Sequence, residues 1–192
     1  MFTLFVDADS LPIRLRRIIL QRAMKENMRT IFVSDRNLKD VCCMIEEHTA
    51  SLRLPLRDTQ VKTELRKIRS SISMLIVESG TDSADNTIVQ MIEEGDIVIS
   101  HDVGLSERAI EKGAVAIDDR GNIYTRENIR ERVSEREYMK AFREMGINDL
   151  NQKSLKEKDY QKFSNSFDAL ISKKYKTAQL RLIWIAGVVW HY

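Results

Sequence analysis

The sequence predicts an α/β fold, in which a mainly parallel β-sheet is sandwiched by helices and followed by a helical C-terminal extension. The first reason is that short apolar segments alternate with amphipathic segments of about 10–15 residues, a pattern typical of βαβ units. The second is that this alternation stops after Asp119, where charged amphipathic segments follow. The 192 residues suffice for one domain with an appended subdomain and a sizeable core.

The first elements alternate between strand and helix. Residues 3–6 are expected to form a short apolar strand that ends at Asp7. Ser10 is a suitable N-cap and Pro12 is tolerated in a first helical turn, so a helix is expected to follow and to continue to about residue 27. A second strand at residues 30–34 and a helix at 38–48 come next.

Residues 50–73 are the least regular part of the first half. Within them, residues 59–71 fit either a helix, with Val61, Leu65 and Ile68 at helical spacing, or a charged excursion. A strand at 74–77 then leads to a helix at 83–94, which Gly95 is expected to end, and to a strand at 96–100. A helix at 105–112, ended by Gly113, precedes the last predicted strand at 114–117.

Beyond residue 124 the sequence predicts helices. Residues 126–145 are expected to form a charged helix or helix pair closed by Gly146, and residues 155–174 an amphipathic helix. We therefore expect an α/β core at 1–124 and a basic helical extension at 125–192 that packs on it as one structural unit. The charges follow this division, because residues 1–119 contain 16 Lys and Arg against 20 Asp and Glu, and residues 120–192 contain 15 against 9.

Composition limits the location and the partners. The net charge of +2 excludes a strongly basic nucleic-acid coat protein. The N-terminal segment lacks the basic region of a secretory signal, and Cys42 and Cys43 lack the spacing of a zinc site, so we expect reduced thiols and a cytoplasmic protein. The longest apolar run, at 182–190, is shorter than the about 20 residues of a membrane-crossing helix, so we expect no membrane partner. Docking of this run on a second copy would give a homo-oligomer.

Aspartates follow successive predicted strands at the points where the strands end. They are Asp7 and Asp9 after the first strand, Asp82 and Asp85 after the 74–77 strand, Asp102 after the 96–100 strand, and Asp118 and Asp119 after the last. Because ligands of an open parallel sheet bind beyond the carboxyl ends of the strands, we expect these acids to converge. Asp96 begins its strand and is expected at the opposite edge.

Each aspartate alone also has a simpler interpretation as a helix N-cap, and Asp82 with Asp85 resembles a capping pair. Together, however, clustered carboxylates raise each other's pKa unless a cation neutralises them. Such oxygen ligands select Mg²⁺ or Mn²⁺, and these ions activate water and neutralise charge on a phosphate. The pattern therefore suggests a metal-dependent phosphodiester hydrolase, with the basic extension flanking a polyanionic substrate.

Three motifs resemble the YaiI/YqxD family of small bacterial proteins, which are placed by fold among the PIN-like nucleases: VDADSLP at 6–12, GTDSADN at 80–86 and DIVISHD at 96–102. The resemblance covers residues 3–50 and 76–172. It implies a PIN-like fold, Mg²⁺ or Mn²⁺ as cofactor, and RNA or another nucleic acid as partner. The site residues that it implies are Asp7, Asp85 and Asp102 as leading metal ligands, Asp9 and Asp82 as further ligands, and Asn86 and Ser100 as polar neighbours. We expect the three leading ligands to be catalytic, and Asn86, Ser100, Arg132 and Arg136 to contact the substrate.

The chain also departs from the family pattern. Residues 50–75 look longer than the usual connection, and the expected glycine-proline element after Gly146 is absent. The apolar tail after Lys176 is a further difference. These departures concern the rim of the site and the oligomeric state more than the metal ligands.

Two other functions remain open. In the first, the protein is a non-catalytic RNA-binding or regulatory module on a degenerate PIN-like fold, whose arginines at 126–143 bind RNA; interleaved glutamates also fit a solvated helix face. In the second, Asp7-Ala8-Asp9 belongs to a phosphatase of the haloacid dehalogenase type, with Lys112 as its basic residue. Our expectation is a divalent-metal-dependent ribonuclease.

Overall fold

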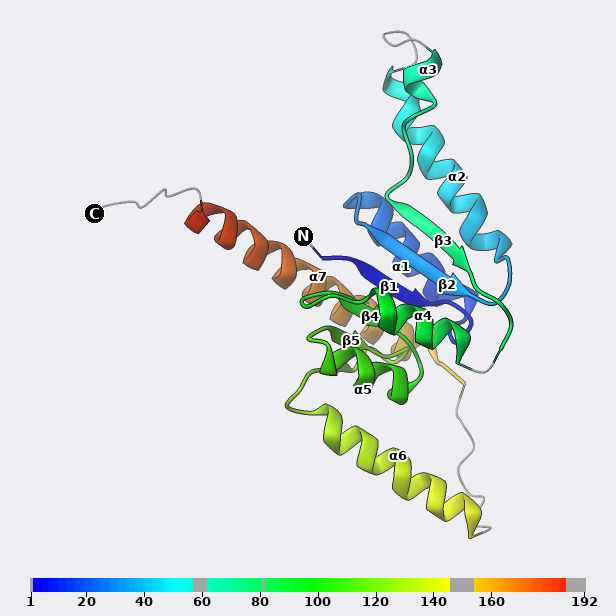
Figure 1. Ribbon diagram of the computed structural model, residues 1–192, viewed down its shortest axis with the longest axis vertical. Coiled ribbons are helices and arrows are strands. Elements are labelled where there is room, and N and C mark those ends of the chain that lie inside the picture. The colour runs from blue at the N-terminus through cyan, green and yellow to red at the C-terminus, as the bar shows by residue number, and fades with distance from the viewer. Residues whose placement is uncertain (1, 57–61, 81, 146–153, 186–192) are drawn as a thin grey trace, which may run out of the picture.

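The computed structural model describes residues 2–56, 62–80, 82–145 and 154–185 (Figure 1). The predicted α/β class is confirmed, with a mostly parallel six-stranded sheet and a C-terminal helix. The strands are β1 (Leu4–Asp7), β2 (Thr30–Ser34), β3 (Ile72–Ile76), β4 (Ile97–Ile99), β5 (Val115–Ile117) and β6 (Ile123–Tyr124). The helices are α1 (Ile13–Lys25), α2 (Lys39–Arg53), the 3₁₀ turn η1 (Leu54–Leu56), α3 (Lys62–Leu65), α4 (Ser83–Met91), α5 (Val103–Glu111), α6 (Ile129–Glu144) and α7 (Glu157–Ile185).

The strand order β3-β2-β1-β4-β5-β6 places the two halves of the sheet on either side of β1. All neighbouring strands are parallel except β5 and β6. The chain first builds outward from β1 to β3, and α4 then returns it to β4, on the other side of β1 (Figure 1). Connections therefore leave β1 and β4 in opposite directions, and such a reversal is the usual ligand site of an open α/β sheet.

Alternation along the strands divides the core between the two faces of the sheet. Leu4 and Val6 of β1 pack in the core that also contains α1 and α7, whereas Phe5 packs in the core covered by α4 and α5. Strand β4 alternates in the same way, since Ile97 and Ile99 belong to the first core and Val98 to the second. Continued alternation places the side chains that follow, those of Asp7 and Ser100, on the α4 and α5 side.

Helix α7 completes the core beneath β1. Its Phe163 and Phe167 are fully buried, stack with ring centroids 5.7 Å apart, and belong to the same core cluster as Leu4 and Val6. Each fully buried aromatic side chain contributes about 2–3 kcal/mol by removing apolar area from water. The boundary at residue 124 stays a prediction, but residues on both of its sides share this core.

Several predicted boundaries differ from the structure. Ser10 does not cap α1: Pro12 occupies the N-cap position without a side-chain bond, and the Ser10 hydroxyl donates to the carbonyl of Asp7 (3.0 Å). Helix α4 ends at Met91, before the predicted stop at Gly95, which instead has a φ of 91° in the following turn. The two-residue strand β6 was not predicted, because a two-residue strand carries no alternation.

Some predictions fall outside the described residues. These are the closure of the helix at Gly146 and the side chains of the apolar run at 182–190, so the proposed oligomer contact stays a prediction. In the part of the chain that the structure describes, no helix combines the length and the apolar character needed to cross a membrane.

Candidate functional site

Four aspartates lie around the point where the strand order reverses. Asp7 ends β1, Asp102 follows β4, and Asp82 and Asp85 lie at the start of α4. We refer to these four residues as the carboxylate cluster. The fifth predicted acid, Asp9, lies in the loop after β1 and is engaged elsewhere, as shown below.

Ser100 links the two acids that follow β1 and β4. Its hydroxyl donates to Oδ2 of Asp7 (2.6 Å) and accepts the backbone N–H of Asp102 (2.9 Å). Asp7 is 5% exposed, and burial raises the pKa of its carboxyl, although the Ser100 hydrogen bond opposes this rise. Because Asp7 and Ser100 follow the neighbouring pair Val6 and Ile99 on the same face, strand register alone brings them together.

Asp102 has two roles at the start of α5. Its Oδ1 accepts the backbone N–H of Gly104 (2.6 Å), which makes it the helix N-cap that the sequence also allowed. The same oxygen accepts a hydrogen bond from Nη1 of Arg136 on α6 (3.0 Å). A Cβ on Gly104 would lie 2.9 Å from this Nη1, so the absence of a side chain there gives the guanidinium access to Asp102.

The pKa of the Asp85 carboxyl shows the effect of the neighbouring acids most clearly. Burial raises the pKa of its carboxyl to about 6, and the charges of Asp7, Asp102 and Asp82 add to this rise, while Arg108 opposes it. No hydrogen bond to the Asp85 carboxylate is found among the described residues. Asp82 does not act as a side-chain cap for α4 and has a left-handed φ of 58°, so the simple capping interpretation of this pair is wrong.

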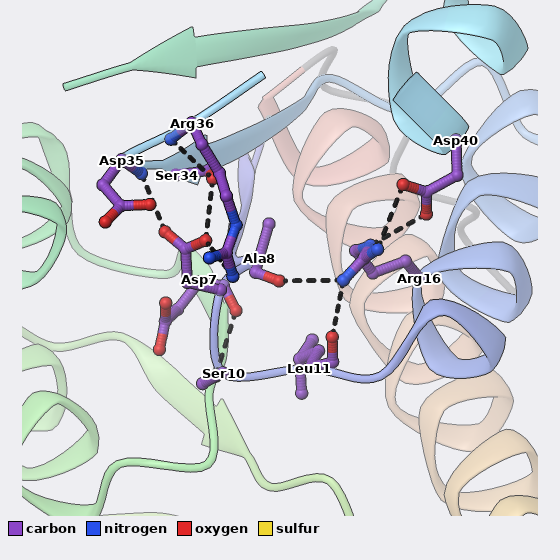
Figure 2. Close-up of polar contacts among 10 residues, drawn as sticks. Asp7, Ala8, Ser10, Leu11, Arg16, Ser34, Asp35, Arg36 and Asp40 are labelled. Carbon is purple, nitrogen blue, oxygen red and sulfur yellow. Dashed lines mark hydrogen bonds and ion pairs between the residues drawn. The ribbon is translucent and has the colours of Figure 1, made fainter. Parts of the chain in front are cut away.

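Asp9 is turned toward β2. Its carboxylate accepts hydrogen bonds from the Ser34 hydroxyl (2.9 Å) and the Asp35 backbone N–H (2.7 Å), and pairs with Arg36 (3.1 Å). Its partners therefore hold the loop after β1 against the loop after β2. Figure 2 shows Ser34, Asp35 and Arg36 gathered on the Asp7 side of the β1–α1 loop.

The predicted substrate contacts are split between two places. Ser100 and Arg136 touch the carboxylate cluster, and Asn86 lies beside it on α4, where its Oδ1 accepts a hydrogen bond from Arg108 (2.7 Å). Arg132 instead pairs with Glu135 (2.8 Å) and lines a separate groove with Tyr124 of β6.

Sequence reasoning missed the ion pair that shapes the β1–α1 loop. Arg16 is buried and forms two hydrogen bonds to Asp40 of α2 (2.9 and 3.0 Å). It also donates to the carbonyls of Ala8 (3.2 Å) and Leu11 (2.7 Å), on the opposite side of the loop from Asp7 (Figure 2). The available signal was a charged residue at a core position of an amphipathic helix, next to Leu15.

His101 pairs with an acid outside the carboxylate cluster. Its Nδ1 lies 3.1 Å from Oδ2 of Asp119, which follows β5, and this hydrogen bond raises the pKa of the imidazole. Its backbone N–H donates to the Ser10 hydroxyl (3.2 Å). The pair ties the ends of β4 and β5 together.

The fit of the cluster to a divalent cation depends on the number and spacing of its acids. Within the described ranges, no group of three or more His, Cys, Asp and Glu side chains is placed so that it could hold a metal ion. The charges of Asp7 and Asp102 nevertheless add to the raised pKa of the Asp85 carboxyl, and a cation at this place would neutralise them. One or two of these carboxylates would suit an ion such as Mg²⁺, which usually keeps several waters and takes substrate phosphates as ligands rather than a full set of protein ligands.

Comparison with known proteins gives consistent matches. The sequence profile described as "Uncharacterized BCR, YaiI/YqxD family" matches residues 40–173. A UPF0178 protein of Desulfotalea psychrophila is 33% identical over 171 residues, which cover 88% of this chain and 97% of the relative. A UPF0178 protein of Acinetobacter baumannii is 35% identical over 178 residues, 92% of this chain and 98% of the relative. A third, from Syntrophotalea carbinolica, is 38% identical over 126 residues, 65% and 85% of the two chains.

Proposed function

Because this chain belongs to the YaiI/YqxD family, whose description states no activity, we propose its function from the site itself: divalent-metal-dependent hydrolysis of phosphodiester bonds in RNA. The resemblance to PIN-like nucleases agrees with RNA hydrolysis but is not sufficient evidence for it, since proteins with the same fold have many different functions.

The observation that carries the proposal is the convergence of acids from the end of β1, the start of α4 and the start of α5, where the charges of Asp7, Asp102 and Asp82 add to the burial that raises the pKa of Asp85 to about 6. A half-buried carboxylate near three other acids is destabilised in its charged form, and a divalent cation would remove that cost. The location supports the same conclusion, because the cluster lies where the sheet order reverses. If these acids acted only as helix caps, acids from three separate elements would not need to lie close enough for their charges to interact.

Asp7, Asp85 and Asp102 are the residues that would hold Mg²⁺ or Mn²⁺, with Asp82 close enough to contribute through water. When bound, such an ion supplies an activated water and neutralises charge on the phosphate. The Ser100 hydroxyl donates a 2.6 Å hydrogen bond to the Asp7 carboxylate and so fixes its orientation. Asp9 is held by Arg36 and Ser34, so its role in this proposal is to shape the loop that carries Asp7.

Basic side chains around the cluster would receive the substrate phosphates. Arg108 and Arg136 lie beside it on α5 and α6, where they bond Asn86 and Asp102. Arg36 of the β2–α2 loop pairs with Asp9, in the loop that follows Asp7. The Arg36 and Arg136 side chains are at least half exposed, so these pairs cost little to exchange for a phosphate.

The test combines metal binding with cleavage. Mn²⁺ is titrated calorimetrically into the wild type, Asp7→Asn/Asp102→Asn, and a matched control, Asp35→Asn, which removes an exposed acid outside the cluster. Labelled single-stranded RNA is then incubated with each protein in Mn²⁺ and in EDTA. We expect binding and cleavage in the wild type and control and their loss in the double variant. Wild-type protein that binds no Mn²⁺ would refute the metal site.

A non-catalytic RNA-binding module remains the second candidate, and one observation favours it. Arg136 already neutralises Asp102, which also caps α5, so part of the cluster is satisfied without a metal. RNA binding that survives EDTA, with no cleavage in Mg²⁺ or Mn²⁺, would support this module. No phosphatase is proposed, because Lys112 donates to the Val89 carbonyl (2.6 Å) from the C-terminal end of α5, whereas Asp102 caps its N-terminal end.

A further inference from the structure

A groove of about 690 Å³ lies between the β5–β6 turn and the first turns of α6. We refer to it as the β6 groove. Its lining includes Arg120, Asn122, Tyr124, Asn128, Arg132 and Glu135. None of the roles proposed for the carboxylate cluster uses these residues as its acids or its rim.

The floor of the β6 groove is rigid. The Asp118 carboxylate accepts the backbone N–H groups of Arg120 (2.9 Å) and Asn122 (2.8 Å), the Asn122 side-chain amide (2.8 Å) and the Tyr124 hydroxyl (2.8 Å). The turn also presses on α7, since a Cβ on Gly121, whose φ is 76°, would lie 2.7 Å from the Cα of Phe163. A ligand entering this groove would therefore not have to order it first.

Arg132 is the side chain of the β6 groove best placed to take an anion. Among the described residues, its guanidinium makes one hydrogen bond, to Glu135, in a pair whose side chains are 42% and 58% exposed. Its Nε is buried and has no partner in that part of the chain. Exposed pairs contribute little, so a phosphate oxygen can replace the Glu135 carboxylate.

The charges that line the groove are balanced, since Arg120 and Arg132 face Glu131 and Glu135. Beside the lining, Lys162 donates to Oδ1 of Asn122 (2.6 Å), and Asp159 pairs with Arg120 (3.7 Å). This charge balance does not by itself favour a ligand of either sign. The position of Arg132 on α6 is more specific.

Helix α6 connects the β6 groove to the carboxylate cluster. Arg132, Arg136 and Lys140 are four residues apart and therefore form a basic stripe along one face, about 6 Å per step. Arg132 lines the groove, and Arg136 contacts Asp102. Lys140 is exposed one turn further. A ligand with negative charges at regular intervals is the chemistry that such a stripe recognises.

We propose that the β6 groove binds the phosphates of a single-stranded RNA on one side of the bond that lies at the carboxylate cluster. This inference rests on the proposed function for the identity of the cluster, but the binding itself requires no metal and no cleavage. Guanidinium groups suit phosphates because their donors form two parallel hydrogen bonds, and the rigid groove fixes the path of the strand. The protein is thereby specific for strands that extend beyond the scissile dinucleotide.

The test measures binding in EDTA, where hydrolysis is absent. Fluorescence anisotropy follows an eight-nucleotide single-stranded RNA and a dinucleotide with the wild type, Arg132→Gln and Arg130→Gln. Arg130 is the matched control, because it is an exposed arginine on α6 outside the stripe. For the longer strand we expect Arg132→Gln to weaken binding about tenfold and to reduce the slope of log K against log salt by about 0.7, the value of one phosphate contact. The dinucleotide should bind equally to all three proteins.

Three results would overturn this proposal: wild type that binds no RNA in EDTA, equal affinities and salt slopes for Arg132→Gln and wild type, or a polyglutamate peptide that competes as well as RNA. Failure of the hydrolase proposal is distinguishable. If the protein never cleaves RNA in Mg²⁺ or Mn²⁺ but shows the Arg132-dependent salt slope, the groove proposal stands and the hydrolase proposal fails. If the protein cleaves RNA but its binding does not depend on Arg132, the hydrolase proposal stands and the groove proposal fails.

Discussion

Nη1 of Arg136 lies 3.0 Å from Oδ1 of Asp102, and the two residues come from different helices, α6 and α5, 34 positions apart. A cationic side chain thus lies on one of the acids proposed to bind a divalent cation. The two cations compete for one carboxylate, so each should weaken the binding of the other.

Replacing Arg136 should therefore separate metal binding from RNA binding. We expect Arg136→Gln to tighten Mn²⁺ binding about two- to fivefold, the worth of an exposed ion pair, and to weaken RNA binding in EDTA. Calorimetric titration and anisotropy measure the two effects, with Arg130→Gln as the control that changes neither. Parallel changes in both affinities would contradict the competition.

Gly104 offers an independent way to displace the same guanidinium. An alanine Cβ would lie 2.9 Å from Nη1 of Arg136 and 3.2 Å from Oδ1 of Asp102, so the flexible arginine should move away. Since Ala stabilises a helix by up to about 1 kcal/mol relative to Gly, Gly104→Ala should fold normally. We expect it to reproduce the Mn²⁺ affinity of Arg136→Gln, and the double variant to add nothing further. Additive effects would show that the two residues act separately.

Asp85 should make the stability of the metal-free protein depend on pH. Its pKa in the folded protein is about 6, above the value of about 3.9 in an unfolded chain, so the folded state binds this proton more tightly. The resulting penalty is absent below about pH 4 and complete above about pH 6. Because Asp85 is partly exposed, we expect Asp85→Asn to gain only about 1 kcal/mol at pH 8, and nothing at pH 4.

Urea unfolding in EDTA at a series of pH values measures this gain, with Asp35→Asn as the control. A gain of equal size at pH 4 and pH 8 would show that the cause is not the ionisation of Asp85. Addition of Mn²⁺ should stabilise the wild type more than Asp85→Asn, since bound metal favours the charged carboxylate.

Arg16 should be necessary for stability rather than for chemistry. Its side chain and that of Asp40 are 8% and 17% exposed, and removal of one partner from a buried pair costs about 3–5 kcal/mol. We expect Arg16→Met to lose stability on this scale in urea unfolding, while Arg17→Met, at the exposed neighbouring position, changes it by less than about 0.5 kcal/mol. Equal losses in the two variants would mean that Arg16 does not hold the β1–α1 loop.

The α/β class was predictable, and so was the placement of Asp7 and Asp102 at the carboxyl ends of neighbouring strands, because both follow from strand periodicity. Apolar segments located the strands, and the rule that ligands bind at carboxyl ends located the acids. The direction of the Asp9 side chain was not predictable, because its partners Ser34 and Arg36 belong to another strand and loop. Local sequence does not encode which neighbour a loop carboxylate will meet.

Other differences arise at a helix start and in contacts between distant parts of the chain. Ser10 was expected to cap α1, but Pro12 begins the helix later and frees the Ser10 hydroxyl for the Asp7 carbonyl. The pair Arg16 and Asp40 spans 24 residues, and Arg136 and Asp102 span 34, so neither appears as a motif. Such tertiary ion pairs depend on helix packing, which composition and periodicity leave open.

The hydrogen bond from Ser100 to Asp7 joins residues 93 positions apart, and Phe163 and Phe167 complete the core beneath the same strand. During synthesis the first acid is therefore made long before the partners that fix its geometry. Since such distant contacts form late in folding, the cluster should assemble only after nearly the whole chain has left the ribosome. For a chain proposed to cleave RNA, this order of assembly would keep the incompletely synthesised protein from cleaving the mRNA that encodes it.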